Sequence, residues 1–326
     1  MTNAPIILPN SSHVIHQQFS AIVNQLHTSP LVVAPALATR NGISPSYIWL
    51  PEGQWENALA FLSQQFPYIH ADIWRRRMEK LEVRDADGNC LQADSQVKRG
   101  MCIYYYREIE NEVAIPFQEK ILFEDEHLLI VDKPHFLPVT PGGQYLRETL
   151  LTRLKASTGI DHLTPLHRLD RETAGVILFS KQIQSRGAYQ SLFQMRQIEK
   201  TYHALAAHLP QQTFPYRKTS RMEESDRFFI MHEVAGTANS ETFISVLERR
   251  EEIDLYQLQP HTGKKHQLRL HMASLGAPIL NDQFYPVALP VGSDDYNRPL
   301  KLLAKSISFI DPISHKKREF NSEQNL

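Results

Sequence analysis

The sequence has very few cysteines: Cys90 and Cys102 are the only two in 326 residues. They are too far apart for a CxxC pair and too few for a disulfide framework, so we expect reduced thiols in a cytoplasmic protein. Long hydrophobic runs are also missing, since no segment approaches the ~20 apolar residues needed to cross a bilayer. The start of the chain lacks the basic and apolar regions of a signal peptide. The sequence therefore argues against a secreted or membrane protein.

An excess of either charge is absent as well. The formal net charge is −1, which excludes a globally basic nucleic-acid binder but leaves room for a locally basic cleft. Hydrophobic residues make up 42% and charged residues 22% of the chain, as in an ordinary globular protein. No internal repeat or low-complexity tract is present. The length exceeds that of one typical domain of roughly 100–200 residues and suggests two.

The amino-terminal third divides into three segments. Residues 1–50 hold few charges and several prolines, with a short amphipathic stretch from Val14 to Leu26, and we assign this extension no function. The pattern of apolar residues over 51–107 predicts two helices followed by a small sheet, with the second helix from Ala71 to Lys80. This order weakly resembles the small RNA-binding domain first recognised in a ribosomal small-subunit protein. The run Arg75 to Arg77 fits either RNA contact or a solvated helix face. Residues 108–120 form an acidic connector.

From residue 121 to residue 326 the pattern is dominated by strands, with helices at irregular intervals. It predicts an α+β domain with a mixed or mostly antiparallel sheet. Strands are expected at 128–131, 176–179, 201–206 and 243–247, and the continuous apolar run at 176–179 indicates burial on both faces. Residues 211–235 are expected to form a loop.

The sharpest motif runs from His167 to Gly175 and leads directly into the strand at 176–179. Asp170 lies in this polar loop between Arg168 and Arg171, and the neighbouring positive charge favours its ionised form. Loops on rigid sheets are where catalytic groups concentrate. The alternative is a surface ion pair or a helix-capping aspartate.

This motif resembles the signature of the RluA-type pseudouridine synthases, which reads H-R-L-D-R-x-T-S/A-G followed by a hydrophobic residue. Further blocks follow in the family's order. Residues 200–204 are similar to its K-T-Y-x-A strand, residues 262–271 to its T-G-R-x-H-Q helix, and residues 124–134 to its first strand. The likeness covers roughly residues 118–312. It implies an isomerase that converts uridine in RNA to pseudouridine without a cofactor.

The resemblance also implies the site. Asp170 is the catalytic carboxylate, Tyr202 stacks on the target base and is a candidate general base, and Arg269 pairs with Asp170. Without the motif, Tyr202 is better explained as a core or cross-strand aromatic, the usual role of Tyr in a sheet, and the alternative for Arg269 is an exposed helix charge. The resemblance further implies that Arg168 matches the family's arginine that fills the gap left when the target uridine leaves its stack. We predict RNA contacts from the polar and basic side chains of the same motifs: Arg168, His167, Arg171, Lys200, Lys264 and His266.

Two other function classes have to be weighed. A metal hydrolase could use His261, His266, His271 and Asp282, but a spacing of five places successive histidines about 140° apart around a helix, so we predict no metal site. A non-catalytic RNA-binding protein of the same fold is the second alternative. We expect RNA as the partner, a monomer, and no obligate protein partner. The sequence does not distinguish ribosomal from transfer RNA, nor direct attack on the sugar from initial proton abstraction.

Overall fold

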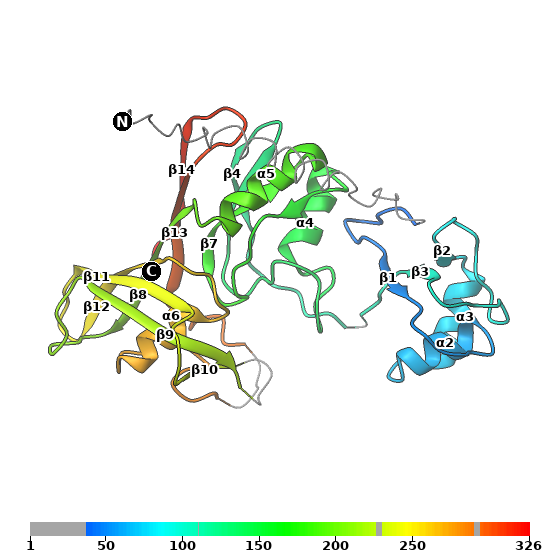
Figure 1. Ribbon diagram of the computed structural model, residues 1–326, viewed down its shortest axis with the longest axis horizontal. Coiled ribbons are helices and arrows are strands. Elements are labelled where there is room, and N and C mark those ends of the chain that lie inside the picture. The colour runs from blue at the N-terminus through cyan, green and yellow to red at the C-terminus, as the bar shows by residue number, and fades with distance from the viewer. Residues whose placement is uncertain (1–36, 110, 226–229, 290–293) are drawn as a thin grey trace, which may run out of the picture. The chain divides into compact units, whose positions relative to one another are not determined.

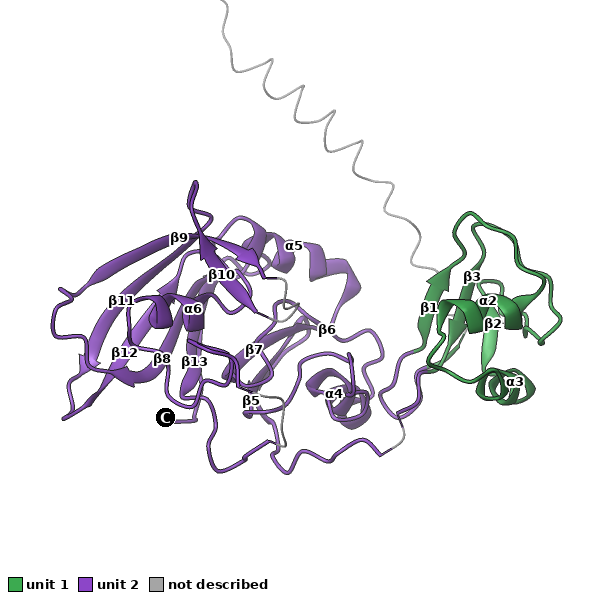
Figure 2. Cartoon of the chain, turned by 90° about the horizontal axis from the view of Figure 1, so that it is seen from below, with its two compact units in different colours: residues 1–38, 45–106 green, residues 39–44, 107–326 purple. Residues whose placement is uncertain are grey.

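The computed structural model describes residues 37–109, 111–225, 230–289 and 294–326. The amphipathic stretch expected at 14–26 therefore lies outside the described residues. The chain divides into two compact units, coloured separately in Figure 2. The small unit comprises residues 1–38 and 45–106, and the large unit comprises residues 39–44 and 107–326.

The small unit contains two helices and a three-stranded antiparallel sheet in its described part. The helices are α2 (Ala58–Gln65) and α3 (Ala71–Glu79), and the strands are β1 (Ser46–Trp49), β2 (Val83–Asp85) and β3 (Cys102–Tyr105), in the order β1-β3-β2. The Asn57 side chain caps α2 by accepting from the Ala60 N–H, as N-cap residues commonly do. Because β1 pairs with β3 along its whole length, residues 46–49 belong to the small sheet although they precede residue 51.

The three consecutive arginines of α3 do not share one environment. Arg77 is buried and its guanidinium lies 4.9 Å from the centre of the Trp74 ring. Arg75 and Arg76 are exposed, and Arg75 forms an ion pair with Asp72 at 2.5 Å. The basic run is thus partly a core contact and partly a solvated face.

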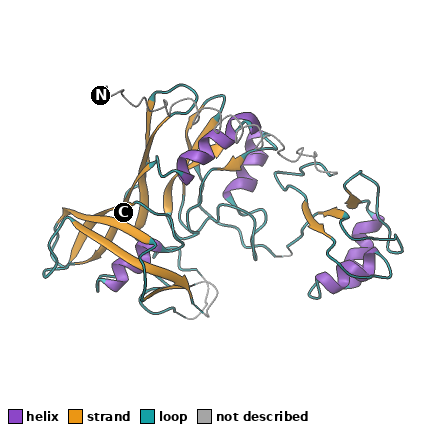
Figure 3. Cartoon of the chain, viewed as in Figure 1, coloured by secondary structure: helices purple, strands orange, loops and turns teal. Residues whose placement is uncertain are grey.

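The large unit is built on one mixed sheet (Figures 1 and 3). In its described residues the order is β10-β9-β11-β12-β8-β13-β7-β5-β4, with β14 beside β13 and β6 beside β7. Among the described strands of this sheet, only the β13–β7 pair is parallel. The predicted α+β class with a mixed, mostly antiparallel sheet is confirmed. The strands are β4 (Lys120–Glu124), β5 (Leu128–Lys133), β6 (Thr164–Pro165), β7 (Ala174–Ser180), β8 (Glu199–Ala207), β9 (Tyr216–Glu224), β10 (Met231–Val234), β11 (Ser240–Glu248), β12 (Ile253–Pro260), β13 (Leu302–Ile310) and β14 (Lys317–Asn321).

The expected loop at 211–235 is wrong, because β9 and β10 occupy most of it. β9 is largely polar, and Met222 is its one residue in the buried class. Its backbone pairs with β11 on one side and β10 on the other. A strand held mainly by its hydrogen-bond ladder lacks the apolar pattern by which strands are recognised in a sequence.

One half of the sheet is covered by a helix on each face. Every residue of β5 and β7 is buried, which confirms the prediction for 176–179. Alternate side chains face α4 (Leu150–Thr158) on one side, and the others face α5 (Ile183–Gln194) on the other. In the second half, α6 (Gln267–Ser274) packs on β8, β11 and β12. Two well-packed halves therefore meet at β13.

The junction between the halves requires a glycine. Gly175 in β7 has φ +116°, and a Cβ there would lie 2.2 Å from the Ala304 carbonyl oxygen of β13. Ala304 is paired on its other side with Tyr202 of β8. Gly175, Ala304 and Tyr202 thus form a row across three strands. This row brings the loop before β7 close to the aromatic ring on β8.

The connector at 108–120 is part of the large unit. The carboxylate of Glu112 accepts hydrogen bonds from the backbone N–H groups of Leu146, Arg147 and Glu148, at 2.6–2.9 Å. Three backbone donors on one carboxylate fix the segment that also carries Tyr145.

Candidate active site

A cavity of about 700 Å³ opens where the two halves of the sheet meet. Its walls come from the loop before β7, from β8, and from the loop that leads into α6. The structure brings every predicted site residue to this one cavity, although they lie in three separate stretches of the chain: His167, Arg168, Asp170, Arg171, Lys200, Tyr202, Lys264, His266 and Arg269.

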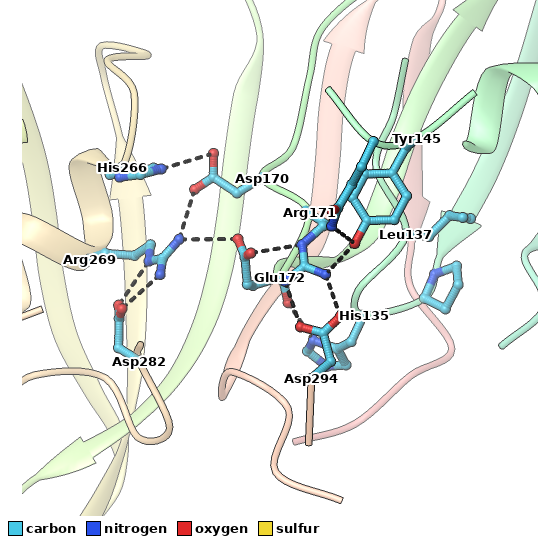
Figure 4. A network of polar contacts seen from close by, with 12 residues as sticks. His135, Leu137, Tyr145, Asp170, Arg171, Glu172, His266, Arg269, Asp282 and Asp294 are labelled. Carbon is cyan, nitrogen blue, oxygen red and sulfur yellow. Dashed lines mark hydrogen bonds and ion pairs between the residues drawn. The ribbon is translucent and has the colours of Figure 1, made fainter. Parts of the chain in front are cut away.

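Asp170 presents a partly exposed carboxylate to the cavity, with 25% of its side chain accessible. Its Oδ2 lies 3.6 Å from Nη1 of Arg269, and its Oδ1 lies 4.0 Å from Nε2 of His266 (Figure 4). Within the described part of the chain, no side chain or backbone group donates a hydrogen bond to this carboxylate. The group is therefore beside positive charge but keeps its lone pairs open.

Arg269 is the central cation of the site and is only 1% exposed. Its Nε and Nη2 donate to the two carboxylate oxygens of Asp282, at 2.8 and 2.7 Å. Its Nη1 lies 3.4 Å from Oε2 of Glu172. Burial lowers the pKa of Arg269, but the hydrogen bond and charge of Asp282 outweigh it and raise the pKa. The expected Arg269–Asp170 pair thus exists as a longer contact, while Asp282 holds the fork of the guanidinium.

Arg171 is bound within the protein. Its guanidinium forms two hydrogen bonds with Asp294, at 2.7 and 2.8 Å, and donates to the Tyr145 hydroxyl at 3.0 Å. Its Nε donates to Oε1 of Glu172 at 3.1 Å. These contacts leave little of the guanidinium for the RNA contact predicted from the sequence.

His167 is also engaged in the fold. Its Nε2 accepts from the Leu178 N–H at 3.2 Å, and its ring stacks on Phe193 with centroids 4.9 Å apart. Burial lowers the pKa of His167 to about 3, so the ring is neutral. An uncharged, hydrogen-bonded imidazole is suited to holding the loop in place rather than to binding phosphate.

His266 precedes α6 in a left-handed conformation, with φ 54°. Its Nδ1 lies 3.1 Å from the Tyr285 hydroxyl, and its ring stacks on Phe284. Burial lowers its pKa, partly opposed by the charge of Asp170. His271 lies within α6, and its two ring nitrogens are hydrogen-bonded to hydroxyls of Thr242, Ser240 and Ser220. Within the part of the chain that the structure describes, no three His, Cys, Asp or Glu side chains are grouped so that they could hold a metal ion.

The other three residues predicted to contact RNA are cations. The side chains of Arg168, Lys200 and Lys264 make no hydrogen bond or ion pair with the described residues, and all three line the cavity. Arg168 and Lys264 are exposed, whereas Lys200 is half-buried and its pKa is lowered by burial. Unpaired cations around a cavity are suited to an anionic ligand.

Tyr202 forms part of the cavity wall and packs against buried clusters in both halves of the sheet. Burial, and then the charge of Asp170, raise the pKa of its hydroxyl. The ring is therefore a neutral, flat surface beside the carboxylate, which is what a stacked base requires.

Lys133 was not recognised from the sequence as a site residue. It is fully buried, and its Nζ donates to the carbonyl oxygens of Pro134, Leu137 and Arg171 at 2.8–3.1 Å. Burial lowers the pKa of Lys133 to about 7, opposed by the charges of Glu172 and Asp170. The sequence did contain a signal for Lys133, because a lysine stands at the end of the largely apolar strand β5. Asp294 had no such local signal, because it reaches Arg171 from a loop 123 residues away. The sequence suggested Asp282, 13 residues after Arg269, only as a metal-ligand candidate.

Two solved human structures are similar to this fold. RNA Pseudouridylate Synthase Domain Containing 4 is 28% identical, with a TM-score of 0.50 over 63% of this chain and 88% of that chain. RNA Pseudouridylate Synthase Domain Containing 1 is 21% identical, with a TM-score of 0.52 over 64% of this chain and 84% of that chain. The fold is therefore that of a pseudouridine synthase.

Sequence comparisons define the family. The family model for RNA pseudouridylate synthase matches residues 127–274. The dual-specificity RNA pseudouridine synthase RluA of Vibrio parahaemolyticus is 31% identical over 60% of this chain and 79% of its own length. An uncharacterized RNA pseudouridine synthase of Synechocystis is 28% identical over 72% and 81%. Human pseudouridylate synthase RPUSD2 is 28% identical, and the chain spans 40% of its length.

The chain belongs to the RluA-type family of RNA pseudouridine synthases, which are isomerases that convert uridine in RNA to pseudouridine. No helix of the described residues is long and apolar enough to cross a membrane.

Proposed function

We propose that this chain isomerises specific uridines in ribosomal or transfer RNA, with Asp170 as the catalytic carboxylate and with the target uridine turned out of its stack into the cavity. The observation that carries this proposal is the meeting of Asp170, Tyr202 and Arg269 at one cavity. These are a nucleophile, a flat aromatic surface and a fixed cation, contributed by three different elements.

Asp170 begins the reaction. Its unbonded carboxylate oxygen either adds to the anomeric carbon or first removes a sugar proton, and both routes break the bond between that carbon and uracil N1. The uracil then turns and joins the sugar through its carbon five. The proton at carbon five is released, and N1 gains a proton, so substrate and product are isomers. No metal or cofactor is needed for this balance.

Tyr202 holds the detached uracil while it turns. Stacking on an aromatic ring supplies ~1–3 kcal/mol per base and tolerates rotation in the plane of the base. In the resting site the Asp170 charge helps keep the Tyr202 hydroxyl protonated. Once Asp170 is esterified to the sugar, that charge is gone and the Tyr202 hydroxyl can give up its proton to solvent more easily. The resulting phenolate, not the neutral hydroxyl, is the form that accepts the proton at carbon five.

Arg168 and the unpaired lysines bind the RNA around the flipped nucleotide. Removing a base from its stack costs a few kcal/mol, which a guanidinium stacked in the gap offsets. Lys200 and Lys264 lie where the flanking phosphates approach, and they contribute a salt-dependent attraction.

The test uses transcripts of the source cell's transfer and ribosomal RNAs, labelled with tritium at carbon five of uridine. We expect wild-type protein to release tritium, also after dialysis against EDTA, and Asp170→Asn to abolish the release while binding the same RNA within about twofold. Substantial turnover by the variant would remove Asp170 from its role. Release from no transcript would leave only an RNA-binding protein of the same fold. Pseudouridine mapping of RNA from cells with and without the gene then identifies the position.

A further inference from the structure

The charged groups around Asp170 do not balance. The carboxylates of Asp170, Glu172, Asp282 and Asp294 form one network of ion pairs with the guanidinium groups of Arg171 and Arg269 (Figure 4). The Lys133 ammonium adds a third cation through electrostatic contacts with Glu172 and Asp170. Because burial lowers the pKa of Lys133 to about 7, four carboxylates face at most three cations, and at least one negative charge is in excess. The excess belongs to the carboxylate that the network binds least.

That carboxylate is Asp170. Asp282 receives two hydrogen bonds from Arg269, and Asp294 receives two from Arg171. Glu172 receives one from Arg171 and a longer one from Arg269. Asp170 has ion-pair contacts of 3.6 and 4.0 Å and no hydrogen bond from the described residues.

The reason lies in one nitrogen atom of Arg269. Its Nε and Nη2 are taken by Asp282, so only Nη1 faces both Glu172, at 3.4 Å, and Asp170, at 3.6 Å. Glu172 is 9% exposed in its side chain and cannot move far, because its other oxygen is held by Arg171. Arg171 is in turn fixed by Asp294 and by the Tyr145 hydroxyl. Glu172 therefore draws the guanidinium away from Asp170.

We propose that Glu172 is a positioning residue that shares Nη1 of Arg269 with Asp170 and so keeps the catalytic carboxylate without a hydrogen bond. This inference rests on the proposed role of Asp170. A carboxylate bound by a short arginine hydrogen bond is stabilised in its free form and is a weaker nucleophile. A carboxylate that is only near the arginine stays ionised and keeps its reactivity.

The experiment replaces Glu172 by glutamine, which has the same shape without the charge. With Glu172 neutral, Nη1 moves to Asp170 and forms the missing hydrogen bond. Because a hydrogen bond stabilises a charged acceptor more than a neutral one, kcat should fall about ten- to a hundredfold. KM should stay within about twofold of wild type, since Glu172 has no RNA contact in the proposed binding mode. The substrate is the tritium-labelled transcript from which wild-type protein releases most label.

Glu172→Asp is the matched control because it keeps the charge. It should restore kcat to within about fivefold of wild type. A crystal structure of Glu172→Gln should place Nη1 of Arg269 within ~3.0 Å of Asp170 Oδ2, a normal hydrogen-bond distance. Unchanged kcat in the glutamine variant, or equal losses in both variants, overturns the proposal.

A variant farther from Asp170 covers the case in which Glu172→Gln does not fold. Asp294→Asn changes a side chain that is 20% exposed, and it should loosen Arg171 and so free Glu172. We expect a two- to fivefold lower kcat at unchanged KM. An unchanged kcat contradicts the inference. Failure here is distinct from failure of the proposed function. In the first case wild-type protein releases tritium and Asp170→Asn does not, whereas in the second case wild-type protein itself releases none.

Discussion

Substitution of Asp282 by alanine should destabilise the large unit strongly. The Asp282 side chain is 1% exposed and accepts two hydrogen bonds from the equally buried Arg269. It also accepts from the backbone N–H groups of Phe284 and Tyr285, at 2.8 and 3.2 Å. Its loss leaves a buried guanidinium and two backbone donors without these partners. Breaking a buried ion pair in this way costs ~3–5 kcal/mol, a large share of the 5–15 kcal/mol that stabilises a typical domain.

The two-unit chain offers an internal control for this measurement. All three tryptophans, Trp49, Trp55 and Trp74, belong to the small unit, so their fluorescence follows its unfolding in urea. Far-ultraviolet circular dichroism is dominated by the sheet of the large unit. We expect the dichroism transition of Asp282→Ala to move to a lower urea concentration with an unchanged slope, while the fluorescence transition stays where it is in wild type.

A second control is a surface pair. Glu319 is 53% exposed and lies 3.9 Å from Lys317; Glu319→Ala should change the unfolding free energy by less than ~1 kcal/mol. If Asp282→Ala lowers the unfolding free energy from the dichroism transition by no more than ~1 kcal/mol, Asp282 is not the partner that holds Arg269. The site would then not depend on Asp282 to hold the arginine.

Three further predictions concern single positions in the large unit. Gly175→Ala should cost at least about 2–4 kcal/mol in the urea assay, because it adds left-handed strain to a Cβ clash with Ala304; a loss below 1 kcal/mol contradicts this. Burial lowers the pKa of His271 from 6.5 to about 4, so its stabilising effect is present above pH 6.5 and is lost as the pH falls to 4, by up to ~1.4 kcal/mol per pH unit. His271→Gln should flatten that decline in unfolding free energy, and an unchanged slope would show that this ring is not held neutral. Tyr202→Phe keeps the stacking surface, so RNA affinity should change less than twofold while kcat falls ~100-fold or more, as for loss of a general base; normal kcat would leave Tyr202 with stacking alone.

The main features of the fold were predictable because several residues together carry the pattern of each element. The apolar run of β7 and the helical spacing of α6 each involve several residues, and each element was found within a few residues of its predicted position. β9 was missed for the opposite reason. It is a polar strand, and what holds it in place is pairing with β11, a segment about 20 residues farther along the chain.

The site was predictable in its members and less so in its contacts. Motif similarity indicated Asp170 and Arg269, and the structure places both at the cavity. It did not indicate that Asp282 binds the fork of Arg269 or that Asp294 occupies Arg171. Such partners depend on where distant loops return to the sheet, and no local pattern of residues encodes that. Likewise, Arg171 and His167 carry the features of RNA ligands in the sequence, yet their polar groups are bonded inside the protein.

The position of β13 has a consequence for synthesis of the chain. β7 and β8 are not paired with each other in the described residues; β13, which the ribosome makes more than 90 residues after β8, lies between them and is paired to both. A nascent chain that ends before residue 302 therefore has the loop of Asp170 and the ring of Tyr202 on two separate pieces. RNA modification by this chain has to wait until the last strands have left the exit tunnel.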